Sequence, residues 1–398
     1  MLELPEHSPL GASGMNRWMV CPGSVSMSVG LSSPSSELAM KGTDAHKVAA
    51  YCLEQQCDAW TLIARGDHHG YGFTFPDGDE VFVDKNMADA VQVYLNAVRS
   101  VHPDAENGDR YIEYGFHCPS IHAMFYGRSD FVHVSRRAKV IHVWDYKHGA
   151  GIVVDVEENP QCMYYAVGVL ESMKLWDQVD TVVLHIAQPR GYHSDGPLRQ
   201  WSIKTTTLWQ WLEDYLLPAM ERAEASRDTI SGEHCRFCPV RSYACPQLLA
   251  DFDELEKLMN ATVTKGSVKK LSNAQIGRLL TLFDTAKIVA KAATETAFTR
   301  MQAGKAIPGR KLTHARANRT WKDGAEDVVR KKFGDKAFTE PKLKTPAKIE
   351  EMPEGAVITA QYAYKPEAGL TVTSSSDTRA SVSKDTKSLF TDTSEGEK

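Results

Sequence analysis

The chain has 398 residues, of which 42% are hydrophobic and 24% charged, and its net charge is −5. A chain of this length exceeds the usual single domain, so we expect two domains or one large domain with appendages. Because the net charge is negative, the chain is not one of the strongly basic nucleic-acid-binding proteins. Any nucleic acid must therefore bind at a local basic patch or channel.

Nothing in the sequence predicts a membrane span or export. No stretch is apolar enough to cross a bilayer, and the first residues lack the basic start and apolar core of a signal peptide. We therefore expect a cytoplasmic protein with no membrane partner. In that compartment the eight cysteines favour reduced thiols or metal ligands over disulfides.

The first half of the chain predicts two helices and then a group of strands. The helices are expected over residues 35–56, with an interruption at Gly42-Thr43, and over the later part of residues 80–101. Residues 57–80 between them are polar and predict a loop. Four strand-like runs follow, at residues 110–117, 124–126, 130–134 and 140–147. The turn between the last two predicts a hairpin.

The next hundred residues alternate between helices and strands. A helix is expected over residues 159–173, with Asn159 as its cap and Pro160 at its first position. Strands are predicted at residues 180–187 and 201–204, and a helix over residues 206–225. This order indicates an α/β core around a mixed central sheet flanked by helices.

The character of the chain changes after residue 250. A long amphipathic helix is predicted over residues 272–301, basic segments follow, and the last residues are rich in Ser, Thr, Asp and Lys. We expect a core domain over residues 1–250, a helical extension over 251–310, a small basic region over 311–370 and a disordered tail over 371–398.

Two acidic residues and a lysine fall on the strands of the predicted hairpin. Side chains alternate along a strand, so Asp145 and Lys147 point to the same side and Tyr146 to the other. If the strands pair, Asp130, Asp145 and Lys147 converge. Two carboxylates hold a hard cation such as Mg²⁺, and a nearby lysine orients a water, which is a minimal set for cutting a phosphodiester. Glu113 is a candidate for a further carboxylate, or else an ordinary surface glutamate.

Three cysteines near residue 240 have the spacing of metal ligands. Two residues separate Cys235 from Cys238, and six separate Cys238 from Cys245. Such a set can hold one metal centre, with Cys21 as the best candidate for the fourth ligand. The residues alone favour a structural zinc site over accidental spacing. The other four cysteines are most simply buried small apolar residues.

Taken in order, these motifs resemble the PD-(D/E)XK nuclease superfamily. The chain is most similar to the RecB-like branch with an iron–sulfur cluster, which includes the CRISPR-associated RecB-like exonucleases, and to a phage-encoded family of unknown function. The resemblance covers roughly residues 10–250. The matching stretches are residues 13–24 with Cys21, Gly42 to His46, Gly127 to Asp130, Asp145 to Lys147, Gln161 to Tyr165, and Cys235, Cys238 and Cys245. Asp145 stands where the commoner residue is glutamate.

The resemblance implies a restriction-endonuclease-like core and a set of roles for these residues. Asp130, Asp145 and Lys147 would be catalytic. Mg²⁺ or Mn²⁺ would be bound by His46, Asp130, Asp145 and the backbone carbonyl of Tyr146, with Glu113 as a further candidate. Cys21, Cys235, Cys238 and Cys245 would hold a [4Fe–4S] cluster, with structural zinc as the alternative. Gln161 and Tyr165 would contact DNA, and Arg128 and Arg190 are further candidates for that role. Arg190 alternatively caps its loop.

The activity implied is that of a metal-dependent DNA exonuclease in phage or prophage recombination, replication or DNA degradation. Its partners would be DNA with a free end and a single-strand-binding or annealing protein, in the cytoplasm of a bacterial host. The competing hypothesis is a non-catalytic DNA-binding or assembly subunit that retains the nuclease fold.

Overall fold

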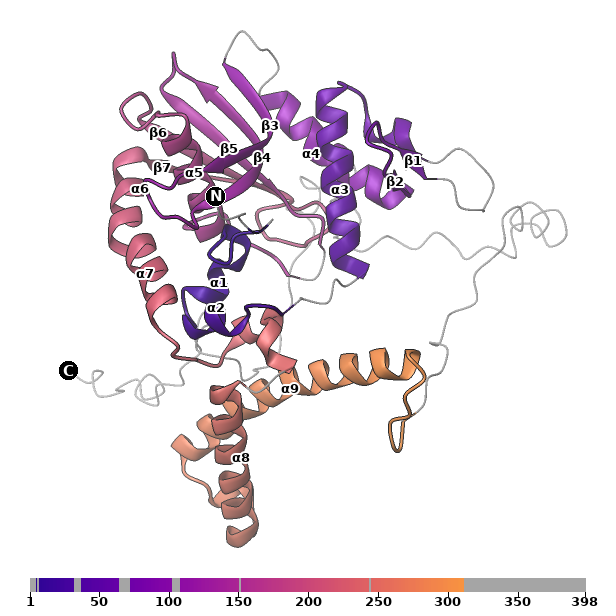
Figure 1. Cartoon of the computed structure of the whole chain (residues 1–398), viewed down its shortest axis with the longest axis vertical. Coiled ribbons are helices and arrows are strands. Elements are labelled where there is room, and N and C mark those ends of the chain that lie inside the picture. Colours follow the sequence, from indigo (N-terminus) through magenta and orange to yellow (C-terminus); the bar gives the residue numbers. More distant parts are fainter. Residues whose placement is uncertain are drawn as a thin grey trace, which may run out of the picture. The chain divides into compact units, whose positions relative to one another are not determined.

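A computed structural model describes residue 5 and residues 7–31, 37–63, 72–101, 108–149, 152–242 and 245–310. Its centre is a five-stranded sheet in the order β3-β4-β5-β6-β7 (Figure 1). The strands are β3 (Asp109–His117), β4 (Tyr126–Ser135), β5 (Val140–Tyr146), β6 (Thr181–Ala187) and β7 (Leu198–Lys204). Only β5 and β6 pair in parallel, whereas the other neighbours are antiparallel. The predicted α/β fold with a mixed sheet is therefore confirmed.

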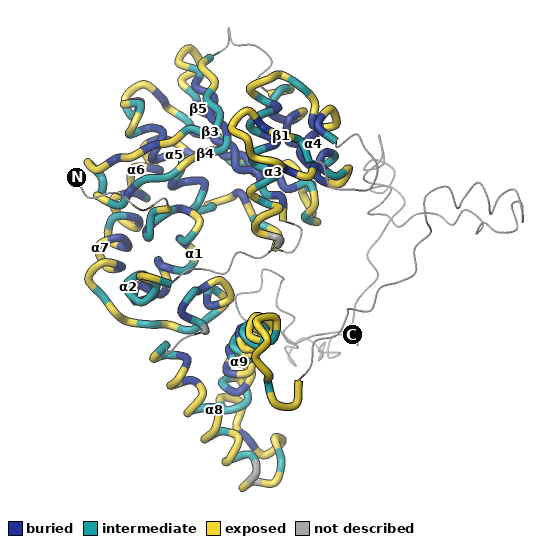
Figure 2. The backbone as a smooth tube through the Cα atoms, turned by 45° about the vertical axis from the view of Figure 1, so that its right-hand side comes forward, coloured by how far each residue is buried: buried dark blue, intermediate teal, exposed yellow. Residues whose placement is uncertain are grey.

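Helices cover both faces of this sheet. On one face α5 (Pro160–Ser172), which connects β5 to β6, shares a core with α6 (Thr205–Trp211) and α7 (Leu217–Ala225). On the other face lie α3 (Glu37–Glu54) and α4 (Lys85–Val101). Figure 2 shows the buried residues gathered along the strands and the helix faces that meet them. Because both faces are covered, β5 and β6 are nearly continuous apolar runs.

Helix α3 differs from its predicted form. It runs from Glu37 to Glu54 without an interruption at Gly42-Thr43. A glycine costs a helix roughly 1 kcal/mol relative to alanine. Burial of Ala45, Val48 and Cys52 in the core shared with α4 outweighs that cost.

The sequence predicts two separate strands at residues 124–126 and 130–134, but the structure has one strand, β4, there. The strand is continuous because residues 126–129 pair with Tyr114 to His117 of β3 and extend the ladder through Gly127. The predicted hairpin of β4 with β5 is confirmed by the pairing of Phe131 with Trp144 and of His133 with His142.

The remaining elements are mostly short. They are η1 (Ala12–Gly14), α1 (Met15–Trp18), α2 (Gly23–Met27), η2 (Ala59–Leu62), β1 (Phe73–Thr74), β2 (Glu80–Val81), the π-helical η4 (Leu212–Leu216), η5 (Glu233–Phe237), η6 (Pro239–Ser242) and η7 (Val268–Lys270). Residues 57–80 thus contain η2 and β1, where only a loop was expected.

Two long helices follow the sheet domain. They are α8 (Pro246–Lys265), most of which falls within the helical extension expected over residues 251–310, and α9 (Asn273–Gln302). Residues Met1–Gln302 form one compact unit, so the boundary expected after residue 250 falls inside it, within α8. The basic region and the tail expected beyond residue 310 lie outside the described residues. Among the helices described here, none combines the length and the apolar character needed to cross a membrane.

Candidate functional site

Asp145 and Lys147 lie where the parallel strands β5 and β6 end. The amide of Lys147 donates to the carbonyl of Ala187, the last residue of β6, at 2.8 Å. Lys147 Nζ lies 3.0 Å from both carboxylate oxygens of Asp145. The carboxyl ends of parallel strands meet at one sheet edge, which is where α/β proteins commonly bind ligands.

Asp130 reaches the same edge from β4. Its Oδ2 accepts a hydrogen bond of 2.6 Å from the amide of Tyr146, and its Oδ1 lies 3.2 Å from Nδ1 of His46 on α3. The backbone of Tyr146 therefore borders the site. His46 comes from the helix on one face of the sheet, and Lys147 points to the other face.

Glu113 lies directly across from Asp130. The β3–β4 register pairs Ile112 with Phe131 and Tyr114 with Ser129, so Glu113 and Asp130 fall between these two pairs. Glu113 has a φ of 50°, in the left-handed region that non-glycine residues rarely adopt. This strained backbone turns its carboxylate toward Asp130 and His46.

His46, Glu113 and Asp130 form a group of possible metal ligands. Among the described residues, they are the three whose ligand atoms all lie within 4.8 Å of one another. Carboxylate oxygens and an imidazole suit Mg²⁺ or Mn²⁺. Asp145, which the resemblance assigned to this shell, lies outside this group, and its carboxylate pairs with Lys147. Glu113, which the sequence offers only as a further candidate, is one of the three residues whose ligand atoms lie close together.

The charges at the site favour binding of a cation. Burial and the neighbouring Asp130 raise the pKa of Glu113 to about 7. Burial raises the pKa of Asp145, and Lys147 only partly opposes this shift. Burial alone would lower the pKa of His46, but Asp130 outweighs it and raises that pKa to about 9. An imidazole must lose this proton to bind a metal.

Lys147 is fully charged in this setting. Burial lowers its pKa, but Asp145 more than compensates, so the pKa is raised above its ordinary value. Lys147 Nζ also donates to Gln161 Oε1 at 2.8 Å, and Gln161 Nε2 donates to the hydroxyl of Tyr165 at 2.9 Å. A protonated lysine serves as a donor and a positive charge, not as a base.

Gln161 and Tyr165 owe their places to the start of α5. The side chain of Asn159 accepts a hydrogen bond from the amide of Cys162 and caps the helix, and Pro160 follows. Residues four apart share a helix face, so Gln161 and Tyr165 both face the sheet edge. The predicted pair is therefore part of a chain of hydrogen bonds that ends at Lys147.

The two candidate arginines have different surroundings. Arg128 is largely exposed, and its Nη1 lies 3.9 Å from Glu113. Arg190 follows β6, and its Nη1 lies 2.8 Å from Nε2 of His148. Burial and Arg190 lower the pKa of His148 to about 4.

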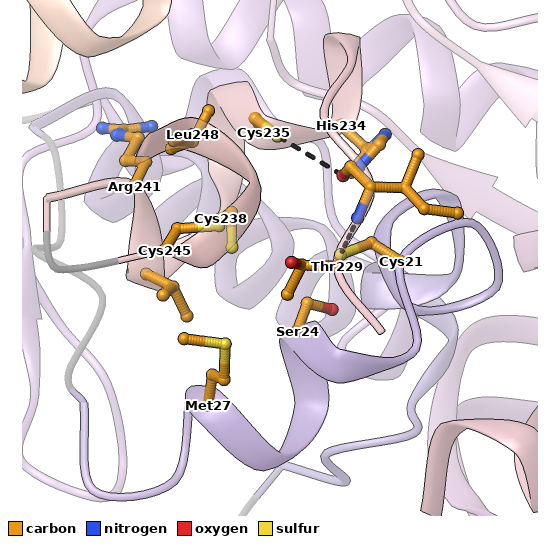
Figure 3. Close-up of a pocket in the computed structure, with 12 residues that line it drawn as sticks. Cys21, Ser24, Met27, Thr229, His234, Cys235, Cys238, Arg241, Cys245 and Leu248 are labelled. Atoms are coloured by element: carbon orange, nitrogen blue, oxygen red, sulfur yellow. Dashed lines mark hydrogen bonds between the residues drawn. The ribbon is translucent and has the colours of Figure 1, made fainter. Parts of the chain in front are cut away.

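The four cysteines of the predicted cluster line one pocket. Cys21, between α1 and α2, faces the same space as Cys235 of η5 and as Cys238 and Cys245, which lie between η5 and α8 (Figure 3). The amide of Ile230 donates to Cys21 Sγ at 3.3 Å. The rest of the lining is mixed: Met27, Ile230, Val240 and Leu248 are apolar, and Ser24, Thr229, His234 and Arg241 are polar.

The sulfur atoms are not drawn together as around a single ion. No three of them lie within 4.8 Å of one another, although all four cysteines are described. Tetrahedral zinc with bonds of about 2.3 Å would need sulfurs about 3.8 Å apart. The donor types fit a thiolate-bound metal centre, but zinc would require these side chains to move inward.

Most of the chain, including the sheet edge and the cysteine pocket, falls within one family match. A family model matches residues 7–380. The chain belongs to the DUF2800 family of proteins of unknown function. The match to DUF2800 extends beyond α9, so the family includes more than the sheet domain.

Three residues at or near the sites of this DUF2800 chain escaped the sequence analysis. Tyr94 of α4 is 1% exposed, and its hydroxyl has no hydrogen-bond partner in the described structure. Its ring stacks on that of Tyr146, with 5.0 Å between the ring centroids. Burial raises the pKa of the Tyr94 hydroxyl, and the carboxylates of the site raise it further. His148 contacts Arg190, and His234 lines the cysteine pocket. Tyr94 follows the apolar spacing of α4, which gives no sign of a functional role. The one sequence signal for His148 is its place next to Lys147.

Proposed function

We propose that this chain is a metal-dependent deoxyribonuclease, and that it acts on DNA ends as an exonuclease. The observation that supports the proposal most strongly is the convergence at one sheet edge. Side chains from several elements meet there: His46 from α3, Glu113 from β3, Asp130 from β4, Asp145 and Lys147 from the end of β5, and Gln161 from α5. A surface built only for stability would not gather three carboxylates at one point, because like charges repel.

His46, Glu113 and Asp130 would hold Mg²⁺ or Mn²⁺. Bound there, the ion would polarise the scissile phosphate and lower the pKa of a water. Asp145 keeps the ammonium of Lys147 charged and directs it. Asp145 and Gln161 occupy two of its three donors, so one remains for the attacking water or a phosphate oxygen. Such a donor stabilises the charge that develops in the transition state.

The preference for DNA ends, and a role in phage or prophage recombination, replication or degradation, rest on the resemblance to RecB-like nucleases. Gln161 and Tyr165 would hold the nucleotide next to the cut. On the other side of the sheet edge, Arg190 is a candidate for a phosphate contact.

A cleavage assay tests the catalytic proposal. Purified protein is incubated with Mn²⁺ and end-labelled DNA whose 5′ or 3′ end is blocked. We expect wild-type protein to release nucleotides, and Lys147→Ala to lower the rate by about 10²-fold or more, as loss of one transition-state donor does. Lys139→Ala is the matched control, because Lys139 is an exposed lysine just before the other end of β5.

Two results would contradict the proposal that the chain is a nuclease. One is wild-type protein that binds DNA but does not cut it, which would favour the non-catalytic DNA-binding subunit. The other is undiminished cleavage by Lys147→Ala.

We also infer that Cys21, Cys235, Cys238 and Cys245 hold a [4Fe–4S] cluster, with zinc as the alternative. The inference rests on the resemblance and on the pocket that the four thiols share. Such a centre would have a structural role, because it would join the N-terminal segment to the segment that precedes α8.

A further inference from the structure

Tyr146, His148 and Arg190 form a chain of hydrogen bonds beside the candidate site. Tyr146 points to the face of the sheet opposite Asp145 and is fully buried. Its hydroxyl lies 2.9 Å from Nδ1 of His148, and Nε2 of His148 lies 2.8 Å from Nη1 of Arg190. His148 is itself 5% exposed. The chain thus leads from the core to the surface.

The partners of His148 determine its protonation. A guanidinium has only donors, so Arg190 donates and Nε2 of His148 accepts. The imidazole is therefore neutral and carries its proton on Nδ1, which donates to the hydroxyl of Tyr146. Both ring nitrogens of His148 thus have a hydrogen-bond partner. The bond to the buried hydroxyl of Tyr146 fixes the orientation of the imidazole ring, and with it the direction from which Nε2 accepts from Arg190. Arg190 is consequently held at one defined nitrogen.

Arg190 lies at the same sheet edge as the candidate metal ligands. It is three residues past Ala187, whose carbonyl accepts from the amide of Lys147. The ring of Tyr146 lies 5.4 Å from the ring of His46. In the described part of the chain, no carboxylate pairs with Arg190 and His148 is its one hydrogen-bond partner. The other guanidinium nitrogens are available to a ligand.

An arginine anchored at one nitrogen and open at the others suits a phosphate. Its planar fork matches two phosphate oxygens. A neutral histidine holds such a group without neutralising it, whereas a carboxylate partner would cancel its charge.

We propose that His148 is a positioning residue that orients Arg190 to bind a phosphate of the DNA strand near the one that is cut. This inference rests on the proposed function, since it assigns the substrate contact on the α3 side of the site. Gln161 would contact the same strand from the α5 side.

DNA binding without cleavage tests this directly. The affinity for a fluorescein-labelled single-stranded oligonucleotide is measured by anisotropy, with Ca²⁺ in place of Mn²⁺, over a range of salt concentrations. We expect Arg190→Ala to weaken binding about tenfold and to reduce the slope of log affinity against log salt by about 0.7, the value for one phosphate contact on a single strand.

The variants of His148 separate positioning from packing. His148→Ala should reproduce the loss of slope seen in Arg190→Ala, although the imidazole does not touch DNA. The double variant should bind no more weakly than Arg190→Ala alone. His148→Gln, whose amide oxygen can replace Nε2 as the acceptor, should restore most of the slope. Arg137→Ala, in the exposed turn between β4 and β5, should leave the slope unchanged.

The outcomes distinguish this inference from the proposed function. An unchanged slope in Arg190→Ala, or a normal slope in a folded His148→Ala, overturns the inference even if wild-type protein cuts DNA. A slope that depends on His148 and Arg190 supports it even if no cleavage occurs with Mn²⁺, in which case only the catalytic proposal fails.

Discussion

Glu113 adopts a left-handed backbone conformation in the middle of β3, opposite Asp130. A non-glycine residue in this region costs of order 1–3 kcal/mol and persists only where its surroundings fix it. The cost comes on top of a second one, because burial and Asp130 disfavour its charged form. The two costs fall on one residue, whose carboxylate is partly buried and close to that of Asp130. A bound cation would offset the repulsion.

Two substitutions of Glu113 separate the strain from the charge. Glu113→Gly and Glu113→Ala both remove the carboxylate, and only glycine accepts the positive φ without strain. We expect the glycine variant to exceed the alanine variant by about 1 kcal/mol in free energy of unfolding, measured in urea without metal.

Calorimetry with Mn²⁺ supplies the second measurement. Both variants should bind Mn²⁺ at least about tenfold more weakly than wild type, since ligand charge sets the affinity of such sites. Equal stability of the two variants would contradict the strained backbone. Unchanged affinity for Mn²⁺ would remove Glu113 from the metal shell.

At the scale of elements, helix packing decides which glycines matter. Gly168 of α5 lies against Phe116 of β3, and a Cβ added there would come within 2.2 Å of that ring. A Cβ added at Gly42 of α3 would instead point into open space. The first glycine allows α5 to approach the sheet closely enough for Gln161 to meet Lys147. The second has no such role in packing.

The two glycines should therefore respond in opposite ways to alanine. Gly42→Ala should raise the free energy of unfolding by up to about 1 kcal/mol through helix propensity. Gly168→Ala should lower it by about 1–3 kcal/mol through overpacking. Chemical denaturation of both variants measures the difference. If Gly168→Ala were as stable as Gly42→Ala, the close packing of α5 on β3 would be refuted.

At the scale of the whole molecule, the cysteine pocket joins segments more than 200 residues apart. Cys21 comes from the N-terminal segment and the other three thiols from the stretch that leads into α8. A backbone bond supports the same junction, since the amide of Gly23 donates to the carbonyl of Asp228 at 2.8 Å. A metal centre there would constrain both ends of the sheet domain.

Loss of one ligand should loosen this junction. We expect anaerobically purified wild-type protein to contain about four iron atoms per chain, as a [4Fe–4S] centre requires. Cys21→Ser should lose most of the metal and melt at a lower temperature. Cys57→Ser is the control, because Cys57 lies outside the pocket.

Elemental analysis and calorimetry decide between the alternatives. One zinc per chain in a colourless preparation would replace the iron–sulfur inference with zinc. Protein that contains neither metal, with equal melting temperatures for both variants, would reject a metal centre altogether.

The sequence by itself determined the elements and the chemistry available to them. The apolar runs of β5 and β6, the capped start of α5 and the alternation of Asp145 with Lys147 are local patterns, and each predicted its element or its face. The spacing of Cys235, Cys238 and Cys245 likewise pointed to a shared site, because these three cysteines lie close together in the chain.

Tertiary structure alone decided how those groups meet. The continuity of α3 and β4 depends on contacts with α4 and β3, which local propensity does not contain. The placement of Glu113 beside His46 and Asp130 follows from the β3–β4 register and from an unusual φ. Neither is encoded in a short motif, because a register is set by the packing of whole strands. The positioning role inferred for His148 arises in the same way, from its contact with Arg190, 42 residues further along the chain.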